Sequence, residues 1–187
     1  MPPPKKAAKK AAKKPAKHHD PKHHETKDLR RAYEHLGRVE LLQNAGQVDA
    51  DVSVLATLAQ KELKAGHVKE AADLLRAAEH LSFAALGSER SKSSAVAADL
   101  KATITEEFDH LLERAEEHWA QGNEGDRHAA VVSLYKRVCK RAKKALDEKS
   151  YRPALELAHA AEALAHVRKH GADQLPSGKE HLKLGRS

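Results

Sequence analysis

The feature that most constrains the fold is an internal repeat. At an offset of 83 residues, 28–83 align with 111–166 without a gap and share 15 identities over 56 positions. The strongest matches pair "LRRAYEH" (29–35) with "LERAEEH" (112–118), and "EAADLLRAAEHL" (70–81) with "PALELAHAAEAL" (153–164). A self-match at one fixed offset indicates that a structural unit has been duplicated. We therefore expect two similar halves.

Each half is predicted to contain three helices. Only 3% of the residues are aromatic, and the chain is rich in Ala, Leu, Lys and Glu, which favours helices. Apolar residues at helical spacing and Gly, Asn or Pro breaks predict helices near 29–44, 51–65, 68–86, 95–121, 127–146 and from 151. We expect an all-α bundle of about six helices, with one helical domain over 28–170 and repeat halves at about 28–86 and 105–170. A polar tail is expected over 171–187.

The net charge of +7 is concentrated at the N-terminus. Residues 1–27 carry nine Lys against Asp20 and Glu25, whereas the rest of the chain holds 25 basic and 25 acidic side chains. Residues 1–27 also lack Val, Ile, Leu, Phe, Tyr and Trp, so they cannot bury enough apolar surface to offset the entropy of ordering. We expect a disordered arm that binds a polyanion.

Within this arm, lysines recur in pairs every four residues: Lys5, Lys6, Lys9, Lys10, Lys13, Lys14 and then Lys17. This composition resembles the Lys/Ala/Pro-rich tails of linker histones and of some bacterial nucleoid proteins. The resemblance implies sequence-independent binding to the DNA or RNA backbone, in which each neutralised phosphate releases a counterion. The alternative is a tail that only increases solubility.

A second basic element is the helix predicted over 127–146, which contains no acidic residue. Its lysines Lys136, Lys140, Lys143 and Lys144 lie at helical spacing on one side, beside Arg137 and Arg141. The aligned stretch 44–63 has only Lys61 against Asp49, Asp51 and Glu62. A phosphate backbone would suit this basic side. An acidic protein partner, or the acid-rich helix 106–117 of the same chain, would suit it equally.

Two groups of histidines raise the question of metal binding. "HHDPKHH" (18–24) has no accompanying Cys, and Asp20–Pro21 indicates a turn, so this flexible cluster is expected to bind metal only adventitiously. Four residues share one helix face at spacings that can hold Zn²⁺: His159, Glu162, His166 and His170. We interpret this face as a solvated polar stripe near a helix C-terminus, where histidine is favourable. No cofactor or metal is predicted.

Small residues in two helix pairs, 54–82 and 138–164, carry two family resemblances. Ala59, Gly66, Ala71, Leu74 and Ala78 resemble a tetratricopeptide-type hairpin, which implies a protein-interaction module. "AGHVKEAADLLRAAEHLSFAAL" is similar to helices of HEPN-type bundles, whose ribonucleases use an Arg and a His four to six residues apart. The pairs Arg30 with His35 and Arg152 with His159 fit, but this composition produces such pairs by chance.

The sequence therefore predicts a non-enzymatic helical protein that binds nucleic acid non-specifically. The alternatives are a tetratricopeptide-like interaction module and a HEPN-like ribonuclease. The single Cys139 and the lack of an apolar run of about 18 residues favour a cytoplasmic protein without a membrane partner, nucleoid-associated if the tail binds DNA. The oligomeric state is not predicted.

Overall fold

The computed structural model describes residues 21–44, 49–90, 98–122 and 129–173, and in these it contains helices and no strand. The helices are α1 (Pro21–Asn44), α2 (Ala50–Ala65), α3 (Val68–Arg90), α4 (Ala98–Gln121), α5 (Ala129–Asp147) and α6 (Tyr151–Asp173). The prediction of an all-α bundle of about six helices is confirmed. None of these helices has the length and apolarity needed to cross a bilayer.

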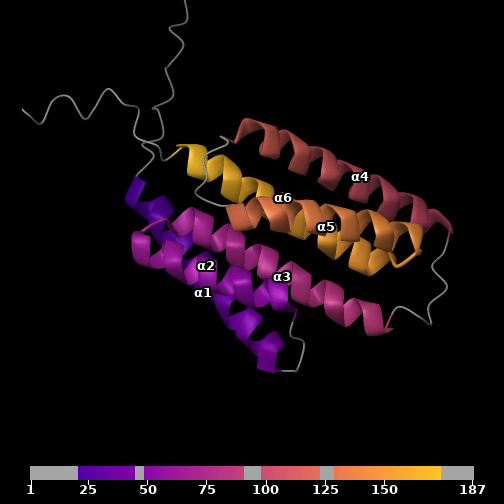
Figure 1. Ribbon diagram of the computed structural model, residues 1–187, viewed down its shortest axis with the longest axis horizontal. Coiled ribbons are helices and arrows are strands. Elements are labelled where there is room, and N and C mark those ends of the chain that lie inside the picture. Colours follow the sequence, from indigo (N-terminus) through magenta and orange to yellow (C-terminus); the bar gives the residue numbers. More distant parts are fainter. Residues whose placement is uncertain (1–20, 45–48, 91–97, 123–128, 174–187) are drawn as a thin grey trace, which may run out of the picture.

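The helices form two similar halves. Shifting α6 back by 83 residues gives 68–90, which are the bounds of α3. In the first half α1 and α2 pack on α3, and in the second α4 and α5 pack on α6. Figure 1 shows the three helices of each half lying together, with α3 and α6 joining the halves. The same positions are buried in both halves, as in Ala59/Ala142, Ala71/Ala154, Leu74/Leu157, Ala78/Ala161 and Leu81/Leu164.

The turns α2–α3 and α5–α6 are built alike. Gly66 follows α2 with φ 84°, and Lys149, its aligned residue, follows α5 with φ 59°. In each turn the next amide reaches back to a helix carbonyl: His67 to Glu62 at 2.9 Å, and Ser150 to Ala145 at 2.8 Å. This is the Schellman pattern, which needs a left-handed residue after the helix. The second half keeps the turn although lysine replaces glycine.

Helices α3 and α6 run antiparallel and bury small side chains between them. Their contacts run from Asp73 with His170 at one end to Gly87 with Pro153 at the other. Buried alanines lie along the two helices between these ends: Ala77, Ala78, Ala160 and Ala161. Small side chains let two helices approach closely. The α3–α6 interface therefore fixes which polar residues of the two halves face one another.

Three helix ends differ from the sequence prediction. α1 begins at Pro21, so the last seven residues assigned to the tail, 21–27, are helical; proline suits the first position of a helix. α3 runs on to Arg90 through Gly87, where a Cβ would lie 3.3 Å from the Pro153 ring. Gly87 thus serves close packing and not helix termination. α6 continues to Asp173. The remaining tail residues, 1–20 and 174–187, lie outside the described residues.

Candidate functional site

The four predicted lysines of α5, here called the α5 lysine row, are all exposed: Lys136, Lys140, Lys143 and Lys144. The two arginines beside them have another role. Arg137 donates to Asp51 at 2.7 Å, and Arg141 donates to Asp49 at 2.9 Å. Asp49 is also the N-cap of α2, whose side chain accepts from the Asp51 amide. The arginines therefore tie the second half to the first, and the lysines are left facing solvent.

Acidic neighbours divide the α5 lysine row. Lys144 lies 3.6 Å from Glu148, and Lys143 lines a shallow cavity with the acids Asp109, Glu113, Glu116 and Asp147. In the described ranges an ion pair is found for Lys144 but not for Lys136 or Lys140, and Lys140 shares a cavity lining with Asp147. Their positive charge is thus the least compensated of the four. The predicted arm lysines from Lys5 to Lys17 lie outside the described residues.

Two glutamates that the repeat retains, Glu79 and Glu162, are buried ion-pair acceptors between helices. Glu79 on α3 accepts from His35 and, at 2.9 Å, from Arg38, both on α1. Burial raises the pKa of the Glu79 carboxyl, but hydrogen bonds from His35 and Arg38 outweigh it and bring the pKa below 4.5. The retained glutamate of the first half is thus a structural residue.

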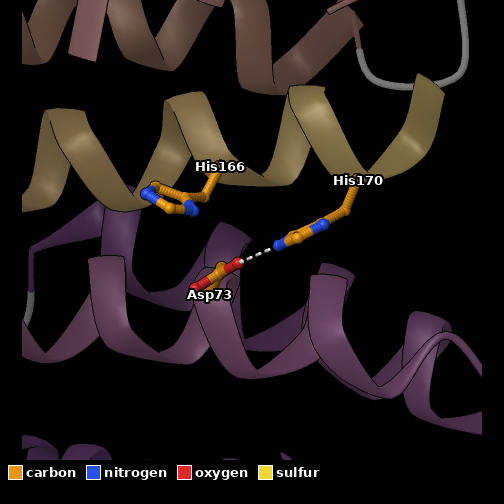
Figure 2. A group of neighbouring side chains, drawn as sticks. All are labelled: Asp73, His166 and His170. Carbon is orange, nitrogen blue, oxygen red and sulfur yellow. Dashed lines mark ion pairs between the residues drawn. The ribbon is translucent and has the colours of Figure 1, made fainter. Parts of the chain in front are cut away.

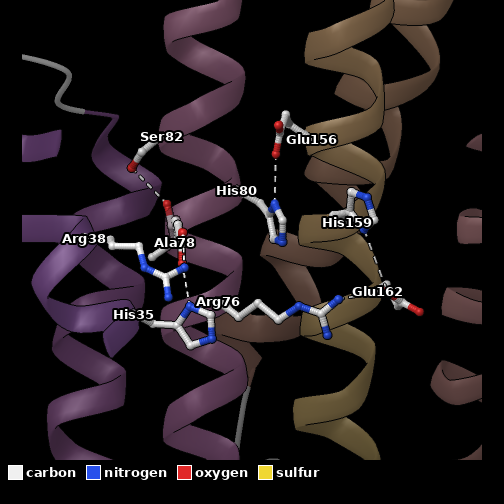
Figure 3. Close-up of polar contacts among 10 residues, drawn as sticks. His35, Arg38, Arg76, Ala78, His80, Ser82, Glu156, His159 and Glu162 are labelled. Atoms are coloured by element: carbon white, nitrogen blue, oxygen red, sulfur yellow. Dashed lines mark hydrogen bonds and ion pairs between the residues drawn. The ribbon is translucent and has the colours of Figure 1, made fainter. Parts of the chain in front are cut away.

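Glu162 has the equivalent place on α6. It accepts from Arg114 of α4 at 2.9 Å and from Arg76 of α3 at 3.3 Å. Figure 3 shows Arg76 crossing from α3 toward Glu162. Glu162 therefore has two arginine partners, which account for a buried carboxylate without any metal ion.

The structure separates the four residues that share one face in the sequence. His159 stacks on His80 with ring centroids 4.9 Å apart, and His80 bonds to Glu156 at 2.8 Å (Figure 3). Burial lowers the pKa of the His159 ring. His166 and His170, two turns and three turns beyond His159 along α6, instead face Asp73 of α3 (Figure 2). The predicted quartet is thus two separate pairs.

His166, His170 and Asp73 lie in a polar cavity of about 470 Å³ between α1, α3 and α6. His170 Nε2 is 3.5 Å from Asp73 Oδ2, and one ligand-type atom from each residue lies within 4.8 Å of the others. The cavity is also lined by Asp28, Arg31, His35, Lys69, Ala72 and Arg76. Burial raises the pKa of Asp73 to about 7, and burial together with nearby His118 lowers the pKa of His166 to about 4. Neutral imidazole and a carboxyl group therefore meet here.

Asp73 was missed by the sequence analysis. It lies one turn before Ala77 on the side of α3 that faces α6, and the repeat aligns it with another acid, Glu156. An acid in both copies beside an apolar stripe is a signal that could have identified it. Its histidine partners, 93 and 97 residues later, could not be inferred before the α3–α6 register was known.

A second group of ligand-type residues closes the α2–α3 turn. His67 Nδ1 lies 2.6 Å from Glu62 and 3.6 Å from Glu70, and both glutamates are buried. Glu70 occupies the first turn of α3, where a carboxylate is favourable. His67 therefore contacts both glutamates at the turn between α2 and α3.

The Arg–His pairs of the HEPN resemblance point to separate partners. Arg30 donates to Glu34 at 2.8 Å on the exposed side of α1, whereas His35 bonds to Glu79. Arg152 is exposed, and His159 stacks on His80. Comparison of the chain with known family models, with curated proteins and with solved structures gave no match.

Proposed function

We propose that the protein binds the phosphate backbone of nucleic acid, without catalysis and without sequence preference. The observation that carries the proposal is that the whole net positive charge of +7 lies in residues 1–27. Apart from Met1, the apolar residues of this segment are alanine and proline. When lysines in such a segment bind a polyanion, the favourable free energy of binding comes chiefly from the counterions that the polyanion releases. The arm is the main contact.

The exposed lysines of α5 supply a second, smaller contact. Lys136 and Lys140 lie one turn apart, about 6 Å along the helix axis, and both are exposed. The Arg137 and Arg141 contacts with α2 hold this helix in place, so the two lysines are presented from a fixed surface. Lys143 and Lys144 contribute less because acids lie beside them.

Neither element is equipped to read a base sequence. Residues 1–27 contain no Arg, Asn, Gln, Phe, Tyr or Trp, and the α5 lysine row offers ammonium groups alone. Base recognition in duplex DNA uses bidentate Arg, Asn or Gln contacts, and single strands are held by aromatic stacking. Affinity is therefore expected to vary with salt and little with sequence.

The test is a salt titration of binding to a labelled DNA duplex, measured by fluorescence anisotropy with the full chain. Changing seven arm lysines to glutamine should reduce the log–log salt slope by up to about six, at about 0.9 per lost phosphate contact. The arm lysines changed are Lys5, Lys6, Lys9, Lys10, Lys13, Lys14 and Lys17. The double variant Lys136→Gln/Lys140→Gln should reduce the slope by about two.

The matched control is Lys61→Gln/Lys64→Gln, which removes the same charge from exposed positions of α2. It should leave the slope unchanged. The proposal fails if the full chain shows no binding at about 50 mM salt. It fails equally if the arm variant binds as the unaltered chain does, because the charge excess would then have no role.

A second candidate is a protein-interaction module. Leu29, Tyr33 and Leu41 are exposed on α1, with Tyr33 60% and Leu41 71% accessible. Their spacing follows the ridge formed by every fourth residue of a helix, which is the surface that another helix packs against. Sedimentation velocity of the unaltered chain and of Leu41→Asp tests self-association through this ridge. A concentration-dependent increase in the sedimentation coefficient that the substitution abolishes would support it.

A further inference from the structure

The cavity between α3 and α6 brings two imidazoles and one carboxyl group together from opposite helices. His166 and His170 are four residues apart, so they project from the same face of α6. Asp73 faces them from α3, and its carboxylate oxygen already contacts His170 (Figure 2). We propose that Asp73, His166 and His170 form a Zn²⁺-binding site.

The spacing of the donor atoms fits a tetrahedral ion. Ligands about 2.0–2.1 Å from Zn²⁺ lie about 3.3 Å from each other at tetrahedral angles. The distance from His170 Nε2 to Asp73 Oδ2 is 3.5 Å. The third donor, on His166, lies within 4.8 Å of both, and bound Zn²⁺ would draw it closer.

The donor set selects the class of metal. Two imidazoles and one carboxylate suit Zn²⁺ and related transition ions, whereas Ca²⁺ and Mg²⁺ prefer an all-oxygen set. Three protein ligands leave the fourth tetrahedral position open, as in sites that exchange water or a substrate. The cavity is also lined by the cations Arg31, Lys69 and Arg76. Arg31 pairs with Asp28 and Arg76 with Glu162, so two of these charges are already compensated.

The surroundings of His166 restrict its ring. His118 of α4 packs against it with centroids 4.2 Å apart, and Lys169 Nζ lies 3.5 Å from His118 Nδ1. Contacts outside the ligand set commonly orient metal-binding histidines. The Glu62–His67–Glu70 group is a weaker candidate, because His67 already pairs with both carboxylates and its residues line neither the cavity of His166 and His170 nor the cavity of Lys143.

The test is isothermal titration with ZnCl₂ on the full chain carrying His18, His19, His23 and His24 changed to alanine, which removes the adventitious "HHDPKHH" ligands. We expect one equivalent of Zn²⁺ to bind. In this background, Asp73→Asn, His166→Gln and His170→Gln should each weaken Zn²⁺ binding at least tenfold. The matched control is His110→Gln, an exposed histidine of α4, which should bind Zn²⁺ as tightly as the background chain.

Circular dichroism establishes that each variant keeps its helices. If a variant does not fold, long-range ¹H–¹⁵N spectra of the background chain give the answer without substitution, since Zn²⁺ should shift the ring nitrogens of His166 and His170. The proposal is overturned if the four-alanine background binds no Zn²⁺. It is also overturned if folded variants bind as tightly as the background, or if other histidine rings respond. None of these outcomes bears on nucleic-acid binding.

Discussion

Replacing Glu79 with glutamine tests the buried acceptor that holds α1 on α3. The Glu79 side chain is 6% exposed and accepts from His35 and Arg38. Glutamine has about the same size as glutamate, but it carries no charge and places an NH₂ group opposite the donor groups of His35 and Arg38. A hydrogen bond to a charged group contributes about 1.5–3 kcal/mol. Arg38 is half exposed, so solvent screening reduces its share to about 1 kcal/mol or less.

The expected loss in the free energy of unfolding at pH 7 is therefore about 2–4 kcal/mol. For a chain of this length the Tm should fall by about 5–15 °C. Urea unfolding followed by circular dichroism at 222 nm measures the free energy directly. The control is Glu34→Gln on the exposed side of α1, which removes one carboxylate that pairs with Arg30 and should change stability little.

The pH dependence gives an independent check with a definite sign. The pKa of Glu79 is lowered from 4.5 in the folded chain, so the unfolded chain binds this proton more readily. The stability that Glu79 contributes is then fully present above pH 4.5 and declines as pH falls through the folded pKa. The difference between the unaltered chain and Glu79→Gln should shrink over that window. Equal stabilities at pH 7, or a difference that stays constant down to pH 3, would refute the reasoning.

Two further predictions concern glycine positions. Lys149→Gly should raise the free energy of unfolding by about 1 kcal/mol, because Lys149 adopts φ 59°. A lower free energy of unfolding in urea would instead show that the lysine side chain stabilises the turn. Gly122→Ala should destabilise by about 1–3 kcal/mol, since its Cβ would lie 2.5 Å from Arg168 Cγ. Arg168 lies 4.4 Å from the Trp119 ring, so tryptophan fluorescence should also change, whereas Gly37→Ala, with nothing within 4 Å, should not destabilise.

Much of the fold was predictable because its determinants are local. Gly66 ends α2 by its own conformational freedom, and Pro153 fits the first turn of α6 wherever the rest of the chain lies. The bounds of α3 and α6 correspond at the offset of 83 residues, whereas those of α1 and α4 do not. Gly87 was misread as a helix break, because its role is to admit the Pro153 ring, and that contact comes from tertiary packing.

The candidate site was predictable only in part. Helical spacing placed His166 and His170 on one face, but it placed His159 and Glu162 there as well. The partners that separate these pairs, Arg76, His80 and Asp73, all come from α3. Helical periodicity identifies the residues that share a helix face, but it does not identify the residues that this face contacts in the folded protein. The same limit applies to Arg137 and Arg141, whose acidic partners lie on α2 and not on the acid-rich α4.

The duplicated halves meet through equivalent helices, as the two subunits of a symmetric dimer do. A dimer of identical subunits must present every interfacial residue twice, so a metal-binding cavity at one end of the interface would recur at the other. At the other end of this interface, the repeat aligns Glu156 with Asp73 and Gly87 with His170, and Gly87 offers no imidazole. Glu156 bonds to His80 instead. Fusion into one chain removes the symmetry constraint. One end of the interface can then hold a metal-binding cavity, while the other end serves only to pack the two halves together.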